Sequence, residues 1–98
     1  MTKMLFERKF GGKMYKFVHT VHTHSYEGYG GERAAKSSAN KKADKLRKEG
    51  FSARVVREIH TIYPPRGAES FYAIYARKDG MTLDQVKVAG QRALGMYS

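Results

Sequence analysis

The chain has 98 residues, which suffice for one domain with a single thin core but not for two domains. It has no Cys, which excludes disulfides, thiolate metal sites and a cysteine nucleophile. With 19 Lys and Arg against 9 Asp and Glu, the formal net charge is +10, and the 41% hydrophobic content is typical of a folded chain. The sequence has no apolar run of about 18 residues and no hydrophobic leader, so we expect a soluble cytoplasmic protein without membrane partners.

Residues 4–24 predict a β-hairpin. Residues 4–10 are rich in large side chains, and residues 13–24 are rich in aromatic and β-branched ones. Between them, Gly11 and Gly12 form a two-residue turn of the kind that accepts positive φ angles.

Residues 32–49 predict an amphipathic helix. Its apolar side chains recur at spacings of four, four and three and form one stripe: Ala35, Ala39, Ala43 and Leu46. Gly50 then supplies the left-handed position that follows many helices.

The second half of the chain predicts two strands and a helix. Residues 51–62 and 69–78 are rich in β-branched and aromatic side chains, and the short Pro64-Pro65-Arg66-Gly67 turn between them favours an antiparallel hairpin. Thr82 and Gln85 fit a capping box at the start of a helix over residues 82–94, which Gly95 ends.

These elements follow one another in the order ββαββα, within a single domain over residues 1–98. The pattern predicts an α+β fold, with a mainly antiparallel sheet of about four strands, both helices packed on one face and the other face partly open. The hydrophobic pattern of residues 13–24 leaves two alternatives for the core, because either Met14 and Val18 or Tyr15, Phe17 and Val21 can face inward.

The excess of basic residues favours a polyanion, DNA or RNA, as the partner. Lys41 and Lys48 lie nearly opposite the apolar stripe of the first helix, and Lys45 flanks them. A solvated helix face is the alternative, although such faces usually mix both signs of charge. Acidic membranes are less suitable because both helices present mainly Ala. The candidate phosphate-binding residues are Lys36, Lys41, Lys45, Lys48, Arg54, Arg57, Arg66, Arg77 and Lys78.

Aromatic side chains provide a second candidate surface. If Val18 and Ile74 face the helices, Phe71 and Tyr75 lie on the open face, where they could stack on unpaired bases. The segment Glu69-Ser-Phe-Tyr-Ala-Ile-Tyr-Ala-Arg77 resembles the third-strand signature of the RNA-recognition motif, and the resemblance covers about residues 14–94. It implies a ferredoxin-like architecture with Phe71 and Tyr75 in the stacking positions. The family's basic-Gly-aromatic-Gly opening is missing, and residues 4–10 would have to replace its closing strand.

Other chemistry is less well supported by the sequence. His22, His24 and His60 could converge on a metal ion, but no carboxylate in residues 19–24 completes the ligand set, and we expect no metal or cofactor. Gly28-Tyr29-Gly30-Gly31 precedes a helix and could contact a phosphate, but it lacks the P-loop ending. No nucleophile has a base beside it in the sequence, and no acids are paired, so we expect no enzyme activity.

The sequence therefore leaves two functions open. The first is a small nucleic-acid-binding module that works mainly by phosphate contacts, with base stacking as an addition. The alternative is a non-enzymatic protein-interaction or assembly module, in which the open face or an unpaired edge strand packs against a second copy or an acidic partner.

Overall fold

The computed structural model describes residues 6–23, 30–61 and 68–96, with the side chains of residues 60, 61, 68 and 69 left out. Its elements are β1 (Glu7–Phe10), β2 (Lys13–His22), α1 (Gly31–Lys48), β3 (Ser52–Thr61), β4 (Ala68–Arg77) and α2 (Leu83–Ala93). The predicted order ββαββα is confirmed, and both helices begin and end within one residue of the predicted bounds.

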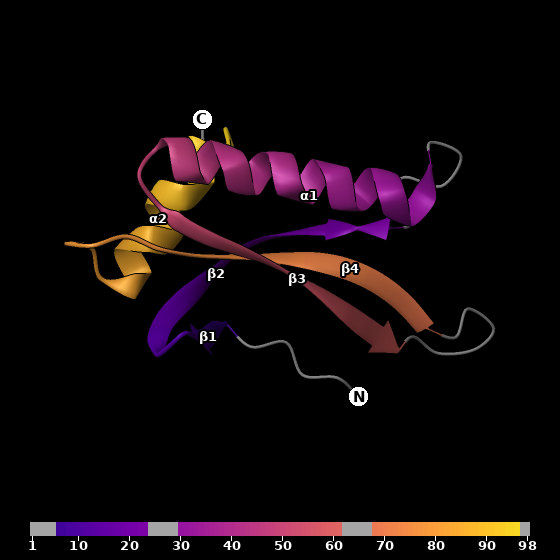
Figure 1. Ribbon diagram of the computed structural model, residues 1–98, viewed down its shortest axis with the longest axis horizontal. Coiled ribbons are helices and arrows are strands. Elements are labelled where there is room, and N and C mark those ends of the chain that lie inside the picture. The colour runs from indigo at the N-terminus through magenta and orange to yellow at the C-terminus, as the bar shows by residue number, and fades with distance from the viewer. Residues whose placement is uncertain (1–5, 24–29, 62–67, 97–98) are drawn as a thin grey trace.

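The four strands form one antiparallel sheet in the order β1-β2-β4-β3. Since β4 lies between β2 and β3, the connection through α1 passes over the sheet (Figure 1). Both helices contribute to one core with the same face of the sheet, where α1 packs mainly on β3 and β4 and α2 mainly on β2. The predicted packing of both helices on one face is thus confirmed.

The apolar stripe of α1 forms the centre of this core. Ala35, Ala39, Ala43 and Leu46 are fully buried, and they pack with Val18, Val21, Ile74 and Val86. A stripe made mostly of Ala keeps the side-chain layer between helix and sheet thin. Gly90 serves the same purpose on α2, because a Cβ atom there would lie only 3.1 Å from Cγ1 of Val18.

A bulge in β2 resolves the two alternatives for its core face. Phe17 is opposite Tyr75 and His19 is opposite Ile74, so Val18 is an extra residue in the pairing with β4. An extra residue shifts the alternation of side chains by one position. Tyr15 therefore joins the layer away from the helices, with Phe17 packed beside it, whereas Val18 and Val21 join the helix layer. Both alternatives of the sequence are realised, each in one half of the strand.

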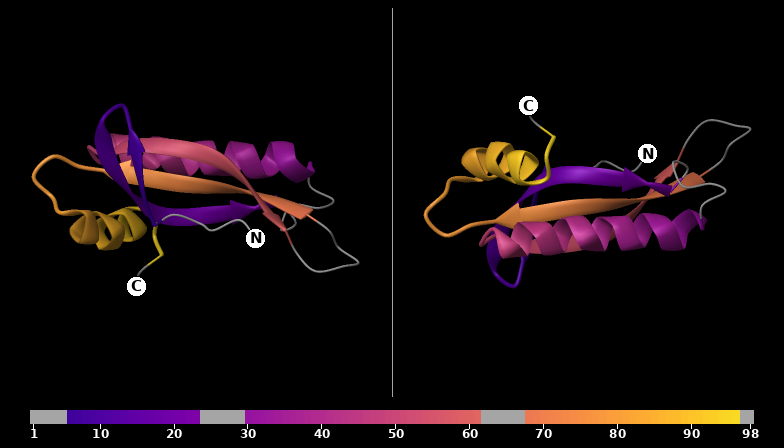
Figure 2. Two further views of the ribbon diagram at one scale, coloured as in Figure 1. Left: turned by 90° about the horizontal axis from the view of Figure 1, so that it is seen from below. Right: turned by 90° about the horizontal axis from the view of Figure 1, so that it is seen from above.

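The face away from the helices is closed over its aromatic residues by the curl of the sheet. Figures 1 and 2 show the hairpin of β1 and β2 bending away from the helices. Phe10 of β1 lies with its ring centroid 5.1 Å from that of Tyr15 and 5.7 Å from that of Tyr75. Tyr15, Phe71 and Tyr75 are consequently buried in a second cluster, and this face is less open than the sequence predicts.

The hairpin also supplies the edge of the sheet beside β2. Gly11 and Gly12 connect its strands with φ angles of 56° and 81°, as the sequence predicts. In the RNA-recognition motif a strand after the second helix closes the sheet, whereas here β1 occupies the edge beside β2.

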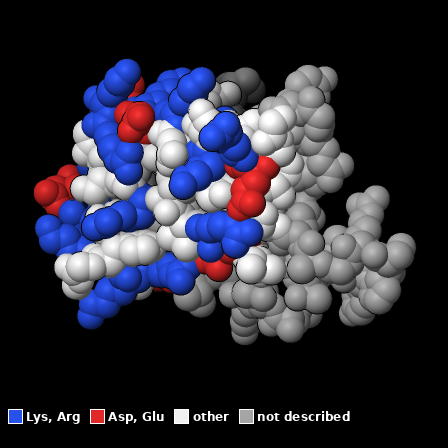
Figure 3. Space-filling model, turned by 45° about the vertical axis from the view of Figure 1, so that its right-hand side comes forward, with Lys and Arg blue, Asp and Glu red and all other residues white. Residues whose placement is uncertain are grey.

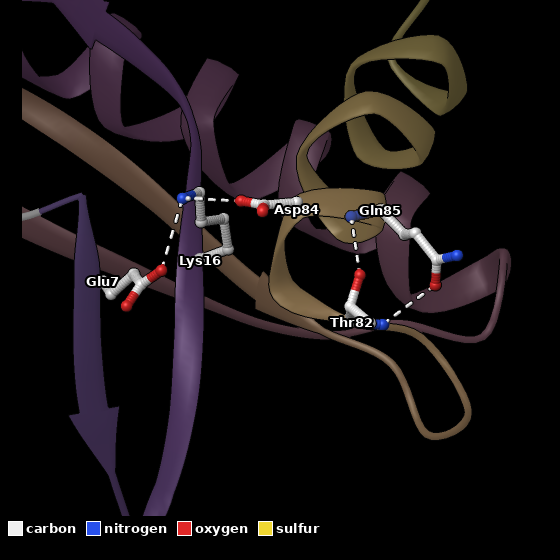
Figure 4. A network of polar contacts seen from close by, with 5 residues as sticks. All are labelled: Glu7, Lys16, Thr82, Asp84 and Gln85. Atoms are coloured by element: carbon white, nitrogen blue, oxygen red, sulfur yellow. Dashed lines mark hydrogen bonds and ion pairs between the residues drawn. The ribbon is translucent and has the colours of Figure 1, made fainter.

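The capping box at the start of α2 is confirmed. The backbone N–H of Gln85 donates to Oγ1 of Thr82 at 3.2 Å, and the backbone N–H of Thr82 donates to Oε1 of Gln85 at 3.0 Å (Figure 4). Two N–H groups that the helix itself leaves without an acceptor are thereby satisfied.

We expect Thr82→Ala to lower the free energy of unfolding by about 1 kcal/mol, because it removes the hydroxyl acceptor of the cap. Thr82→Ser keeps the hydroxyl and is expected to stay within about 0.5 kcal/mol of the wild type. Urea denaturation of the three proteins measures both effects. Equal stabilities of the Ala and Ser variants would contradict a stabilising cap.

Candidate nucleic-acid interface

The outer face of α1 carries a row of lysines. Lys41, Lys45 and Lys48 follow one another at intervals of four and three residues, so they lie along one side of the helix. All three are exposed, and their side chains take part in none of the ion pairs among the described residues. Lys36 is also exposed on α1, five residues before Lys41 and outside the row. Figure 3 shows Lys and Arg spread over the described part of the surface in view, with only small acidic areas between them.

The acidic residues are mostly engaged in internal ion pairs. Within the described part of the chain these pairs are Arg8–Glu58, Arg47–Asp44, Arg57–Glu32, Arg77–Asp79 and Lys16 with both Glu7 and Asp84. Figure 4 shows Lys16 of β2 between Glu7 of β1 and Asp84 of α2. These pairs neutralise acidic residues without involving the lysine row of α1.

Two of the predicted phosphate-binding residues take part in these pairs. Arg57 pairs with Glu32 of α1, which also accepts a hydrogen bond of 3.1 Å from the hydroxyl of Tyr72. The hydrogen bond from Arg57 is the largest cause of a lowered pKa of Glu32. Arg77 pairs with Asp79 at 2.8 Å. Both arginines are therefore less available to a phosphate than the lysines of α1.

Lys78 has a structural role at the end of α1. Its Nζ donates to the backbone carbonyl of Glu49 at 2.9 Å and lies 4.9 Å from the ring centroid of Phe51. A cation beside the last carbonyls of a helix is favourable because the helix dipole is negative there. Arg66 lies outside the described residues.

An arginine pair lies where α1 ends and β3 begins. Arg54 is exposed and its guanidinium lies 5.9 Å from the ring centroid of Phe10. Arg47 donates to the carbonyl of Ala53 at 2.9 Å and to Asp44 at 2.7 Å. Both arginines line one surface hollow together with Tyr15, Phe51, Ser52 and Ala53. Arg54 is among the phosphate-binding residues that the sequence predicts, whereas Arg47 is not, although helical spacing places it on a flank of the basic face of the helix.

The two predicted stacking residues have little exposed surface. Phe71 is 7% exposed and Tyr75 is fully buried, although both lie on the face away from the helices as the resemblance implies. Arg8 lies over the same cluster, 6.0 Å from the ring centroid of Tyr75, and its ion pair with Glu58 joins β1 to β3. Base stacking by Phe71 and Tyr75 stays a prediction, and their burial gives it no support.

The histidines do not gather into a described metal site. His24 and the side chain of His60 lie outside the described part, and no group of three metal-ligating side chains occurs among the described residues. His19 is half-buried on the helix face of β2. Burial, followed by the positive charge of Lys42 and the proximity of His22, lowers the pKa of His19 below its usual range.

This lowered pKa predicts a pH dependence of stability. The neutral form of His19 is favoured in the folded state, so its contribution is fully present above the ordinary value of about 6.5 and is lost as the pH falls through the folded pKa. We expect the free energy of unfolding to decrease between about pH 7 and 5 and to decrease less in His19→Gln. Urea denaturation at several pH values measures this. His22→Gln is the control, and an equal flattening in both variants would contradict the assignment to His19.

Comparisons with known proteins identify no relative. No protein-family model matches the chain, and no match was found among the curated proteins or the solved structures. No described helix is long and apolar enough to cross a membrane. The function must therefore be argued from the charges and surfaces of this chain alone.

Proposed function

We propose that this protein is a small nucleic-acid-binding module that contacts the phosphate backbone through the exposed face of α1. The observation that carries the proposal is the exposed row of Lys41, Lys45 and Lys48, which takes part in none of the ion pairs among the described residues. On a chain with a net charge of +10, such a row favours a polyanion.

The length of the row is suitable for a nucleic-acid strand. Lys48 lies seven positions after Lys41, which corresponds to about 10 Å along a helix that rises 1.5 Å per residue. This is about three times the axial rise of about 3.4 Å per nucleotide in one strand of a duplex. Several neighbouring phosphates can thus be contacted by one helix face.

The burial of the aromatic cluster favours backbone contacts over base contacts. A base can stack only on an exposed ring, and the rings of Phe71 and Tyr75 are covered. Phosphate contacts carry little sequence information. We therefore expect similar affinities for unrelated sequences, with a strong dependence on salt.

The test is a titration of labelled single- and double-stranded DNA and RNA, followed by fluorescence anisotropy at two or more salt concentrations. We expect the triple variant Lys41→Gln, Lys45→Gln, Lys48→Gln to bind about tenfold or more weakly. The slope of log affinity against log salt is expected to decrease by about 2 to 3, because each phosphate contact contributes about 0.7 to 0.9.

The matched control removes three positive charges elsewhere, through Lys9→Gln, Lys13→Gln and Lys87→Gln. All three positions lie outside α1, and we expect a smaller loss of affinity than in the α1 variant. Thermal unfolding verifies that both variants are folded. Absence of binding by the wild type at low salt would refute the proposal, and equal losses in both variants would refute α1 as the interface.

A second candidate function is assembly with another copy of the chain. One observation favours it: Met81 and Val88 are 36% and 42% exposed beside a groove that also includes Phe51, Ala89 and Ala93. If the protein acts as a monomeric nucleic-acid-binding module, light scattering after size-exclusion chromatography should give the 11.1 kDa of one chain. A stable dimer that Val88→Asp dissociates, together with no nucleic-acid binding, would favour assembly.

A further inference from the structure

We infer that Arg47 and Arg54 form a bidentate binding site for an internal phosphodiester of the bound nucleic acid. This inference rests on the proposed function and assigns it a specific phosphate position. The site is the hollow between the end of α1 and the start of β3, which Arg47, Ser52 and Arg54 line together with the nearly buried Tyr15 and Phe51.

Arg47 is held in place by two contacts from its own surroundings. One terminal nitrogen donates to Asp44 in the preceding turn of α1, and the other donates to the carbonyl of Ala53 at the start of β3. A guanidinium has five N–H donors, so these two bonds leave further donors available. The guanidinium is thus oriented by the protein before a ligand arrives, and its side chain is still 48% exposed.

Arg54 approaches the same hollow from β3. Its guanidinium packs near the ring of Phe10, and it makes no hydrogen bond to another described residue. Its N–H donors therefore have no acceptor among the described residues. The contact with the ring of Phe10 limits the movement of the guanidinium. Arginine is well suited to phosphate because its planar fork can donate two parallel hydrogen bonds to two oxygens.

The surroundings of the hollow also favour an anion. Ser52 provides a hydroxyl donor next to Arg54. Asp44 is the acidic residue in contact with the pair, and its carboxylate is bound to Arg47. Lys45, Arg47 and Lys48 all lie in the last turn of α1, so the site adjoins the end of the lysine row. A strand bound along the row would therefore reach this end of α1.

A guanidinium site differs from a surface that attracts by charge alone in one testable respect. A site that depends on the guanidinium fork is weakened when Arg is replaced by Lys, although the charge is unchanged. A surface that acts by charge alone is insensitive to the exchange of Lys and Arg. Arg54→Lys and Lys13→Arg therefore form a matched pair of variants with no change in net charge, since Lys13 lies outside both α1 and the hollow.

The experiment measures binding of a 20-nucleotide RNA, labelled at its 3′ end and carrying either a 5′-hydroxyl or a 5′-phosphate. We expect Arg54→Lys to weaken binding about five- to tenfold and Arg54→Gln somewhat more, equally for both RNAs. We expect Lys13→Arg to remain within about twofold of the wild type. Arg47→Lys should weaken binding similarly, and its thermal unfolding must be compared because it also loses the bond to Ala53.

The outcomes separate the inference from the proposed function. If the wild type binds neither RNA, both are refuted. If the wild type binds and the triple lysine variant binds weakly, but Arg54→Lys binds like the wild type, only the arginine site is refuted. If Arg54→Lys weakens only the 5′-phosphorylated RNA, the hollow binds a terminal phosphate, and the assignment to an internal phosphodiester is overturned.

Discussion

Strand β2 contributes side chains to the clusters on both faces of the sheet. The bulge at Val18 decides which of its residues face each cluster. A regular strand alternates its side chains strictly, so Tyr15, Phe17 and Val21 would all face the same way. The extra residue changes the phase between the two halves of the strand. Tyr15 can then complete the aromatic cluster while Val21 completes the helix-side core.

The rest of the architecture depends on this change of phase. Val18, 1% exposed, lies under α2 at the point where Gly90 leaves room for it. Bulges increase the local twist and bend a strand. The hairpin of β1 and β2 curls away from the helices, and this brings Phe10 against Tyr15 and Tyr75 and Arg8 to Glu58. A curled sheet with a core on each side is thereby formed from a short chain.

The same contacts sort the charged residues into two groups. Ion pairs between elements hold Arg8, Lys16 and Arg57, whereas the lysines on the outer face of α1 have no acidic partner among the described residues. Exposed ion pairs contribute little to stability, typically less than about 1 kcal/mol each. Their larger consequence here is the distribution of charge, because the acids are neutralised internally and the excess positive charge remains on the surface.

Much of the fold could be predicted because its signals are local. The alanine stripe of α1, the Gly11-Gly12 turn and the box formed by Thr82 and Gln85 each depend on residues within a few positions of one another. The antiparallel pairing of β3 and β4 follows in the same way from their short connection. The excess of basic residues, which suggests a polyanionic partner, is likewise a property of the sequence itself.

The candidate site could be predicted only in part. The row of lysines on α1 follows from helical spacing, but the pairing of Arg57 with Glu32 joins residues 25 positions apart, and that of Arg8 with Glu58 joins residues 50 apart. Which cations are free therefore depends on sheet order and register. Arg47 bonds to the carbonyl of Ala53, next to Arg54 in β3, because the end of α1 folds back onto the start of that strand.

The sequence by itself determined the elements, their order, the outer face of α1 and the net charge, since each depends on composition or on short-range spacing. Only the tertiary structure decided the phase of β2, the burial of Phe71 and Tyr75 and the hollow that Arg47 and Arg54 both line. The physical reason is that side-chain direction in a strand is set by its pairing with distant strands, and one extra residue at Val18 reverses it.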